Sequence, residues 1–387
     1  MTAAALRFEF QMPTRIVVQD GGRAHIAEHL MTFGIRRLLL ITDPGVKRTG
    51  VLAAVHASLA ATHIHVDEFA GVQPNPRTVD CNALAAEYRG YGIDGVLAVG
   101  GGSAIDFAKA MSVLLTHDGV VEDYVSARPL TRPVLPVTCI PTTAGTGSEV
   151  TYYAVLTDPV LGAKVCLADT RLAPVLAVLD AQVLATLPAA IVASTGLDAL
   201  THAIEAYTGR RANPFSDALA LAAIRSIAMH LEAAVDDAAT TARGEMLVAS
   251  TMAGLAFGNA DVAAVHCLAE ALGGRYNWPH GVCNAILLPH VFAHNMSTSP
   301  RRHAEVAYAL GVDRTRNATS AADAAVTRLF ELTARLAIPR LQAMQGVNPA
   351  DFAQLAAHAK ANISDSSNAR AMSTEDYAHI LEVAYSE

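Results

Sequence analysis

The sequence predicts a chain in two halves, an α/β half followed by an all-helical half. In the first half, short apolar runs that end at turn residues alternate with helix-like segments. Strand signals fade after Leu187-Pro188, where Ala- and Leu-rich helical segments follow one another to the end. The 387 residues, 52% of them hydrophobic, are enough for two domains with sizeable cores. We therefore predict two domains, residues 1–188 and 189–387.

Five apolar runs of the first half are predicted as strands. They are Arg37–Thr42, Ile64–Phe69, Gly95–Gly100, Val134–Ile140 and Val175–Leu179. Helical patterns lie between them, and this alternation indicates a mostly parallel sheet with helices on both faces.

Other segments place helices and one further strand. The helix pattern of the first half is clearest over Val79–Tyr91. In the second half, Asn213-Pro214 and Ser373-Thr374 have the polar cap residues that begin helices. The opening segment, residues 8–18, alternates like a strand and would expose an unpaired edge if left alone, so we expect a homodimer or a higher homo-oligomer. The alternative is that this segment pairs with a strand of its own chain.

Composition excludes several classes of protein. The formal net charge is −8 and no basic run occurs, which argues against a nucleic-acid binder. Neither a secretory signal nor an apolar stretch of about 20 residues is evident, so no membrane association is expected. The five cysteines form no CxxC pair and indicate a reducing compartment, from which we expect a cytoplasmic protein.

Two small-residue loops follow predicted strands and are candidate phosphate sites. In the first, Gly101, Gly102 and Ser103 open a helix, whose N-terminal N–H groups favour an anion. A tight turn that needs positive φ is the alternative. The second loop, residues 141–149, offers hydroxyls to a phosphate or ribose, or is a polar turn with a helix cap. Its candidate contacts are Thr142, Thr143 and Thr146. Ligands of open α/β sheets bind beyond such strand ends.

Four residues of the helical half could hold a divalent metal. Asp198 and His202 are four residues apart and share a helix face, His266 lies in another helical stretch, and His280 lies in a loop. One carboxylate and three imidazoles suit iron or zinc. An Asp/His pair at this spacing also stabilises a helix by itself, so spacing suggests the site without establishing it.

Four ordered motifs give the sequence a specific resemblance. The runs GGGSAIDFAKA, PTTAGTGSEVT, GLDALTHAIEAY and YNWPHGVCNAILLPH resemble those of the iron-containing (group III) alcohol dehydrogenases. Their order and separations match, and the similarity extends from Pro13 to the last helix. The sequence is thus identified as a member of that family.

The resemblance implies an N-terminal α/β dinucleotide-binding domain and an all-α C-terminal domain, the dehydroquinate-synthase-like architecture. It implies NAD, a divalent metal (iron, with zinc as the alternative) and hydride transfer between an alcohol and an aldehyde or ketone. It also implies the roles of individual residues. The metal ligands would be Asp198, His202, His266 and His280, and the cofactor contacts would be Asn75, Gly101, Gly102, Ser103, Thr142, Thr143, Thr146 and Lys164.

Asp43 follows the first predicted strand of the sheet, where the family meets the adenosine ribose. A carboxylate there can accept hydrogen bonds from ribose hydroxyls and would repel a 2′-phosphate, which favours NAD over NADP. The alternative is that Asp43 only starts the Asp-Pro-Gly turn.

Two positions depart from the family pattern. Glu270 stands where relatives often have histidine, one helical turn after His266, and Tyr153 stands where they often have asparagine. We expect Glu270 to line the active site as a catalytic or metal-supporting carboxylate. The alternative is a surface glutamate, or one paired with Arg275.

Two rival functions remain at this point. One is an NAD- and metal-dependent lyase or cyclase of the same fold, which would need more basic residues in the cleft. The other is a non-catalytic metal-binding protein. The substrate, a small alcohol or carbonyl compound, is not marked by any single motif.

Overall fold

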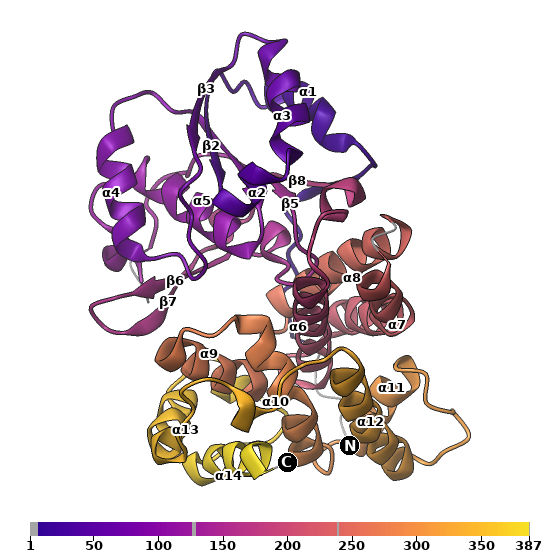
Figure 1. The fold of residues 1–387 in the computed structure, drawn as a ribbon. Coiled ribbons are helices and arrows are strands. Elements are labelled where there is room, and N and C mark those ends of the chain that lie inside the picture. The colour runs from indigo at the N-terminus through magenta and orange to yellow at the C-terminus, as the bar shows by residue number, and fades with distance from the viewer. Residues whose placement is uncertain (1–6, 126–128, 238–239, 387) are drawn as a thin grey trace.

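The computed structural model describes residues 7–125, 129–237 and 240–386. Its first half is built on a six-stranded parallel sheet in the order β1-β8-β5-β4-β2-β3, and its second half is helical (Figure 1). This confirms the predicted fold class. The sheet strands are β1 Arg15–Val18, β2 Arg37–Thr42, β3 His65–Phe69, β4 Gly95–Gly100, β5 Val137–Pro141 and β8 Leu176–Leu179. The helices of this half are α1 Ile26–Thr32, α2 Pro44–Arg48, α3 Val51–Ala60, α4 Thr78–Tyr88 and α5 Gly102–Leu114.

Side chains of the central strands alternate between two separate apolar layers. Leu38 and Leu40 of β2 belong to the core that includes α1 and α3. Leu39 and Ile41 belong to the core that includes α4 and α5. There are two layers because successive side chains of a strand point to opposite faces. Helices on both faces are what a buried parallel sheet requires.

The second half packs its helices around a core continuous with the first of these layers. The helices are α6 Ala189–Thr208, α7 Pro214–Asp236, α8 Thr240–Gly258, α9 Ala264–Tyr276, α10 His280–Asn295, α11 Pro300–Ala309, α12 Ala318–Arg335, α13 Phe352–Lys360 and α14 Thr374–Ser386. Asn213 caps α7 as its sequence predicts, accepting hydrogen bonds from the N–H groups of Phe215 and Ser216.

The two halves meet at a backbone contact between Gly147 and Gly254. A Cβ at Gly147 would lie 2.4 Å from Gly254 Cα, and Gly147 has a φ of +60°. Gly147 begins the short helix η3, Ser148–Val150, and Gly254 lies on α8. Only glycine fits both the conformation and the space at this junction.

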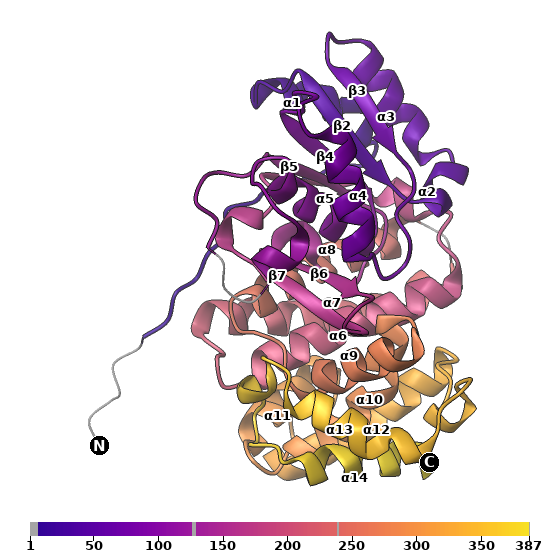
Figure 2. The same cartoon turned by 90° about the vertical axis from the view of Figure 1, so that its left-hand side faces the viewer.

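Prolines explain two shifted strand boundaries. The strand predicted over residues 134–140 begins instead at Val137, directly after Pro136, which has no N–H to donate. The opening segment forms a strand only over Arg15–Val18, after Pro13. Before it, Gln11 exchanges two hydrogen bonds with the side chain of Asn259, and Phe8 and Phe10 contact Phe215. The segment of residues 7–14, which precedes β1, lies on the outside of the molecule (Figure 2).

A hairpin between the sheet and α9 was not predicted. Its antiparallel strands are β6 Tyr153–Asp158 and β7 Ala163–Ala168 (Figures 1 and 2). The turn between them contains Asp158-Pro159 and Gly162, ordinary turn chemistry that the strand pattern did not separate from the preceding loop. The hairpin matters because β7 contributes Lys164.

Helix α7 alone, among the described residues, is long and apolar enough to cross a membrane. Its buried side chains, among them Ile224 and Ile227, belong to the common core, and it packs on α6 and α8. Of its most apolar 18-residue window 33% is buried, and one such helix is weak evidence for a membrane span.

Candidate active site

The two predicted loops lie together at the carboxyl ends of β4 and β5. Thr142 donates its N–H to the carbonyl oxygen of Gly100, 3.0 Å away. A Cβ at Gly101 would lie 3.1 Å from Thr143 Oγ1, and one at Gly102 would lie 2.7 Å from Thr146 Cγ2. The structure therefore brings the glycines and the three threonines into one surface. The glycines are needed because any side chain would displace the threonines.

This surface has the chemistry of a phosphate site. Helix α5 begins at Gly102 with Gly101 as its cap residue, and no side chain caps it. The first N–H groups of a helix need an acceptor, and an anion supplies one. Ser103, in the first turn, is half-buried beside them.

Asp43 borders the same surface and also caps a helix. Its Oδ1 accepts the N–H of Val46 at 2.9 Å, which starts α2. Its other oxygen, Oδ2, would lie 3.4 Å from a Cβ at Gly100. The two interpretations of Asp43 are thus compatible, because one oxygen starts the turn while the other faces the glycine loop.

A buried lysine braces the second loop from behind. Lys109 of α5 is fully buried and donates to Ser148 Oγ (3.0 Å), Thr151 Oγ1 (3.3 Å) and the carbonyl of Tyr153 (2.7 Å). Asp106 accepts from Ser148 Oγ at 2.5 Å. Burial lowers the pKa of Lys109 and raises that of Asp106, and each partially offsets the shift of the other. The sequence placed both residues on this helix without revealing the network.

Three of the four predicted metal ligands form one compact group in the helical half, and the fourth lies beside it. Asp198, His202 and His266 are buried, and their ligand atoms all lie within 4.8 Å of one another. The prediction that His280 lies in a loop is wrong, because Pro279 caps α10 and His280 is its first residue. Its Nε2 lies 3.7 Å from Asp198 Oδ1. The helices α6, α9 and α10 pack together, which places these residues face to face.

Burial keeps the imidazoles in the form that binds a metal. Desolvation lowers the pKa of His202 to about 3 and that of His266 to about 4. Burial would raise the pKa of Asp198, but the three histidines outweigh it and lower that pKa. Two neutral imidazoles and one carboxylate at neutral pH are the protonation states of a metal site.

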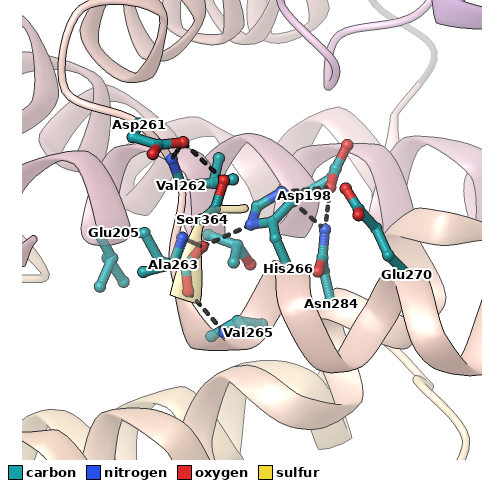
Figure 3. Close-up of polar contacts among 12 residues, drawn as sticks. Asp198, Glu205, Asp261, Val262, Ala263, Val265, His266, Glu270, Asn284 and Ser364 are labelled. Carbon is teal, nitrogen blue, oxygen red and sulfur yellow. Dashed lines mark hydrogen bonds and ion pairs between the residues drawn. The ribbon is translucent and has the colours of Figure 1, made fainter. Parts of the chain in front are cut away.

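Glu205, which sequence reasoning missed, orients His266 from behind. Its Oε2 lies 2.5 Å from His266 Nδ1 and also accepts the N–H of Ala263, while its Oε1 accepts the N–H of Val265 (Figure 3). Burial raises the pKa of Glu205 to about 7, against these two backbone donors. A carboxylate on the far nitrogen fixes a ligating imidazole and its tautomer. Glu205 follows His202 by three residues, so its position on the same helix was the available signal.

Asn284 marks the centre of the donor set. Its Nδ2 lies 2.6 Å from Asp198 Oδ1 and 3.1 Å from the Nε2 atoms of both His266 and His280. Two hydrogens cannot satisfy three acceptors. Two buried atoms, His202 Nδ1 and Asn284 Oδ1, have no hydrogen-bond partner among the described residues. The surplus of buried acceptors over hydrogens at this point fits a divalent metal.

The remaining candidates lie between the hairpin and α9. Lys164 Nζ donates to Asn75 Oδ1 at 2.7 Å, and Asn75 Nδ2 donates to Asn277 Oδ1 at 2.8 Å. Burial lowers the pKa of Lys164, and the nearby carboxylate of Glu270 opposes this.

Glu270 is half-buried and points toward Asp198 and Asn284 in Figure 3. Its Oε2 accepts from Asn362 Nδ2 at 2.7 Å. The alternative pairing with Arg275 is wrong, since Arg275 lies 3.2 Å from Asp351 instead.

Tyr153, the other departure, packs on its neighbour. Its ring centroid lies 4.5 Å from that of Tyr152, and burial raises its pKa. A half-buried aromatic ring therefore stands at the start of β6 in place of the polar side chain of asparagine.

Comparison with known proteins agrees with this geometry. Residues 13–181 match the family described as iron-containing alcohol dehydrogenase, and residues 192–385 match the C-terminal part of the same family. The chain belongs to the iron-containing alcohol dehydrogenase family. As a member, it is a metal-dependent, NAD-linked oxidoreductase that interconverts alcohols with aldehydes or ketones. The lyase or cyclase and the non-catalytic alternatives are not favoured.

Individual relatives of this iron-containing alcohol dehydrogenase cover its full length. The 1,3-propanediol dehydrogenase of Klebsiella pneumoniae is 36% identical over 98% of this chain and 99% of its own. The NAD-dependent methanol dehydrogenase of Bacillus methanolicus is 33% identical over 97% of this chain and 99% of its own. The crystal structure of a 1,3-propanediol oxidoreductase superposes with a TM-score of 0.95 at 35% identity, covering 98% of this chain and 100% of that one.

Proposed function

We propose that the paired loops and the Asp/His cluster are the two halves of one active site, in which an alcohol is oxidised reversibly. The observation that supports this most directly is the convergence of Asp198, His202 and His266 within 4.8 Å. The division at residue 188 then separates a dinucleotide-binding domain, 1–188, from a metal-binding domain, 189–387.

The α/β domain binds NAD in this proposal. The diphosphate contacts the start of α5 and the threonine loop through Gly101, Gly102, Ser103, Thr142, Thr143 and Thr146. Asp43 accepts from the adenosine ribose, and Asn75 and Lys164 lie toward the nicotinamide end. Lys164 is held in place by Asn75 and Thr157.

The helical domain holds iron, for which one carboxylate and three imidazoles are suitable ligands, with zinc as the alternative. When bound, the metal supplies Lewis acidity to the substrate oxygen and NAD supplies the hydride acceptor. Asp198, His202, His266 and His280 orient that centre, and Glu205 fixes the imidazole of His266. The packed helices exclude water from three of the four ligands.

Glu270 receives the proton that the alcohol loses, directly or through a water. Its Oε2 is held by Asn362, which leaves Oε1 as the accepting atom. The carboxylate of Glu270 raises the pKa of His266, against the lowering by burial, so the charge of Glu270 lies close to the metal ligands. A general base must lie within hydrogen-bond reach of its proton, or one water away.

The function is tested by the absorbance of reduced nicotinamide with the iron-loaded protein and a panel of primary alcohols, diols and their aldehydes. We expect alcohol-dependent NAD reduction that is lost when a chelator removes the metal. The proposal would be contradicted if protein with stoichiometric iron and bound NAD showed no activity with any member of the panel.

Replacing Asp43 with asparagine is expected to shift the cofactor preference toward NADP. The change removes the repulsion between the carboxylate and a 2′-phosphate, about 1–4 kcal/mol at contact distance, which corresponds to roughly 5- to 1,000-fold in the ratio of kcat/KM values. Asparagine also keeps the cap on Val46. In the companion Asp43→Ala variant the same shift should come with a stability loss of about 0.5–2 kcal/mol. An unchanged cofactor ratio in both variants would refute the role.

Replacing Glu270 with glutamine is expected to lower kcat for alcohol oxidation by about a hundredfold. Glutamine keeps the shape and the contact with Asn362 but cannot accept the proton, so the acid side of the pH–rate profile should flatten. Steady-state kinetics across pH, with metal content measured in parallel, tests this. The control variant is Glu331→Gln, whose side chain is exposed on α12, and it should have the kcat and the pH–rate profile of wild type. Wild-type turnover and an unchanged profile in Glu270→Gln, with metal bound, would exclude the role.

Light scattering at micromolar concentration is expected to give twice the chain mass. In the described part of the chain, β1 is an edge strand that pairs only with β8, and Val18 on it is 62% exposed. Phe8 and Phe215, which contact each other, are also exposed. An exposed edge with apolar side chains favours pairing with a second copy. A stable monomer would contradict the dimer. We propose that this dimer acts in the cytoplasm on a small alcohol or carbonyl substrate.

A further inference from the structure

One side-chain hydrogen bond joins the two domains beside the candidate site. Asn75 Nδ2 donates to Asn277 Oδ1 at 2.8 Å, although 202 positions separate the two residues. Both have positive φ, 55° for Asn75 and 54° for Asn277. Asparagine is among the few residues that tolerate this conformation, so the two backbones favour the same residue type that the contact uses.

The cofactor side fixes the orientation of the Asn75 amide. Lys164 Nζ, which can only donate, lies 2.7 Å from Asn75 Oδ1, so that atom is the oxygen and Nδ2 faces Asn277. Lys164 also donates to Thr157 Oγ1, and the carbonyl of Pro76 accepts the N–H of Thr157 at 2.8 Å. The loop of Asn75 is thus tied to the hairpin from which Lys164 reaches the cofactor side.

The metal side connects Asn277 to His280. Asn277 ends α9, with its N–H on the carbonyl of Gly273 at 2.9 Å, and His280 begins α10 three residues later. Between them Trp278 is buried and stacks on Tyr276, with ring centroids 4.5 Å apart. This short connection leaves His280 little freedom once Asn277 is fixed.

His280 is the metal ligand that most needs this support. Its side chain is 36% exposed, against 2% for Asp198 and 3% for His266. The compact group of ligand atoms within 4.8 Å contains Asp198, His202 and His266 but not His280. Three ligands are therefore set by the helix core, and the fourth, the first residue of α10, depends on the short connection that precedes it.

We infer that the Asn75–Asn277 hydrogen bond couples occupation of the dinucleotide site to retention of the metal at His280. The inference rests on the proposed function, which places NAD against Asn75 and Lys164 and the metal at His280. A cofactor that orders the first pair steadies Asn277 and hence His280. Because coupling between two binding sites is reciprocal, the metal also tightens NAD binding by the same factor.

The test is the Kd of Co²⁺, followed by its visible absorption bands, for the metal-free full-length protein with and without saturating NAD. In wild type we expect NAD to lower this Kd by roughly 5- to 150-fold. Asn277→Gly keeps the left-handed backbone and removes the amide, so the factor should fall to about one. Asn277→Asp keeps an Oδ1 acceptor and should retain the coupling.

Three results would overturn the inference alone. The first is no effect of NAD on Co²⁺ affinity in wild type. The second is a wild-type factor in Asn277→Gly at unchanged Co²⁺ affinity. The third is a wild-type factor in that variant with Co²⁺ affinity lowered equally with and without NAD, which would mark a merely structural role. Wild-type protein that binds neither Co²⁺ nor NAD would instead overturn the proposed function, and the inference with it.

Discussion

Replacing His266 with alanine is expected to remove the metal and to lower kcat/KM by at least about a thousandfold. Loss of the metal removes several kcal/mol of Lewis-acid stabilisation, and each 1.36 kcal/mol corresponds to a tenfold change in rate. His266 lies in the compact ligand group and is the only one of the four proposed ligands with a carboxylate, that of Glu205, on its second nitrogen among the described contacts. Its loss leaves an incomplete donor set and a buried carboxylate without its partner. Metal analysis and alcohol-dependent NAD reduction measure the two effects.

The control is His230→Ala, a helical histidine that is half-buried, whereas His266 is buried, and whose Nδ1 lies 2.9 Å from the carbonyl of Ser226 on α7. It should keep wild-type metal content and turnover. Circular dichroism and NAD binding, measured by fluorescence, confirm that His266→Ala is folded. Stoichiometric metal in folded His266→Ala would remove this residue from the ligand set.

Replacing Gly147 with alanine is expected to lower the free energy of unfolding by about 2–5 kcal/mol. About 1–2 kcal/mol comes from forcing an L-residue into the left-handed region, at a φ of +60°. A further contribution of about 1–3 kcal/mol comes from overpacking, because the new Cβ would lie 2.4 Å from Gly254 Cα and backbone cannot give way as a side chain can. Urea denaturation followed by far-UV circular dichroism measures the change.

Gly34→Ala separates these two contributions. Gly34 also has a positive φ, +73°, but a Cβ there meets no atom within 4 Å, so only the conformational cost of about 1–2 kcal/mol applies. Equal losses in the two variants would mean that the junction between the halves relaxes around the added methyl group. Gly147→Ala should also raise KM for NAD, because Gly147 directly follows Thr146 in the cofactor loop.

The fold was predictable from sequence where local signals and tertiary packing agree. The strand Arg37–Thr42 has the predicted limits because its apolar run is buried on both faces and ends at a strong turn. The hairpin β6–β7 was missed because its polar and apolar residues follow a loop motif without a break. The opening segment was overpredicted because alternation alone does not supply a partner strand.

The candidate site was predictable in its residue types and less so in its supports. Asp198 and His202 share a helix face by spacing alone, and the motif order named the other ligands. Glu205 and Asn284 were missed because their role depends on how α6, α9 and α10 pack, which no single segment encodes. The same limit applies to Lys109, whose three acceptors come from a different part of the chain.

The strand order also determines when the first domain can be completed during synthesis. The edge strand β1 pairs in register with β8, Arg15 opposite Leu176, so its partner leaves the ribosome some 160 residues later. At about 5–20 residues per second, β1 waits roughly 8–30 s while β2, β3 and β4 can already pair with one another. During that interval the nascent chain exposes an apolar strand without a neighbouring strand. The sheet is complete only when nearly half the protein has been translated.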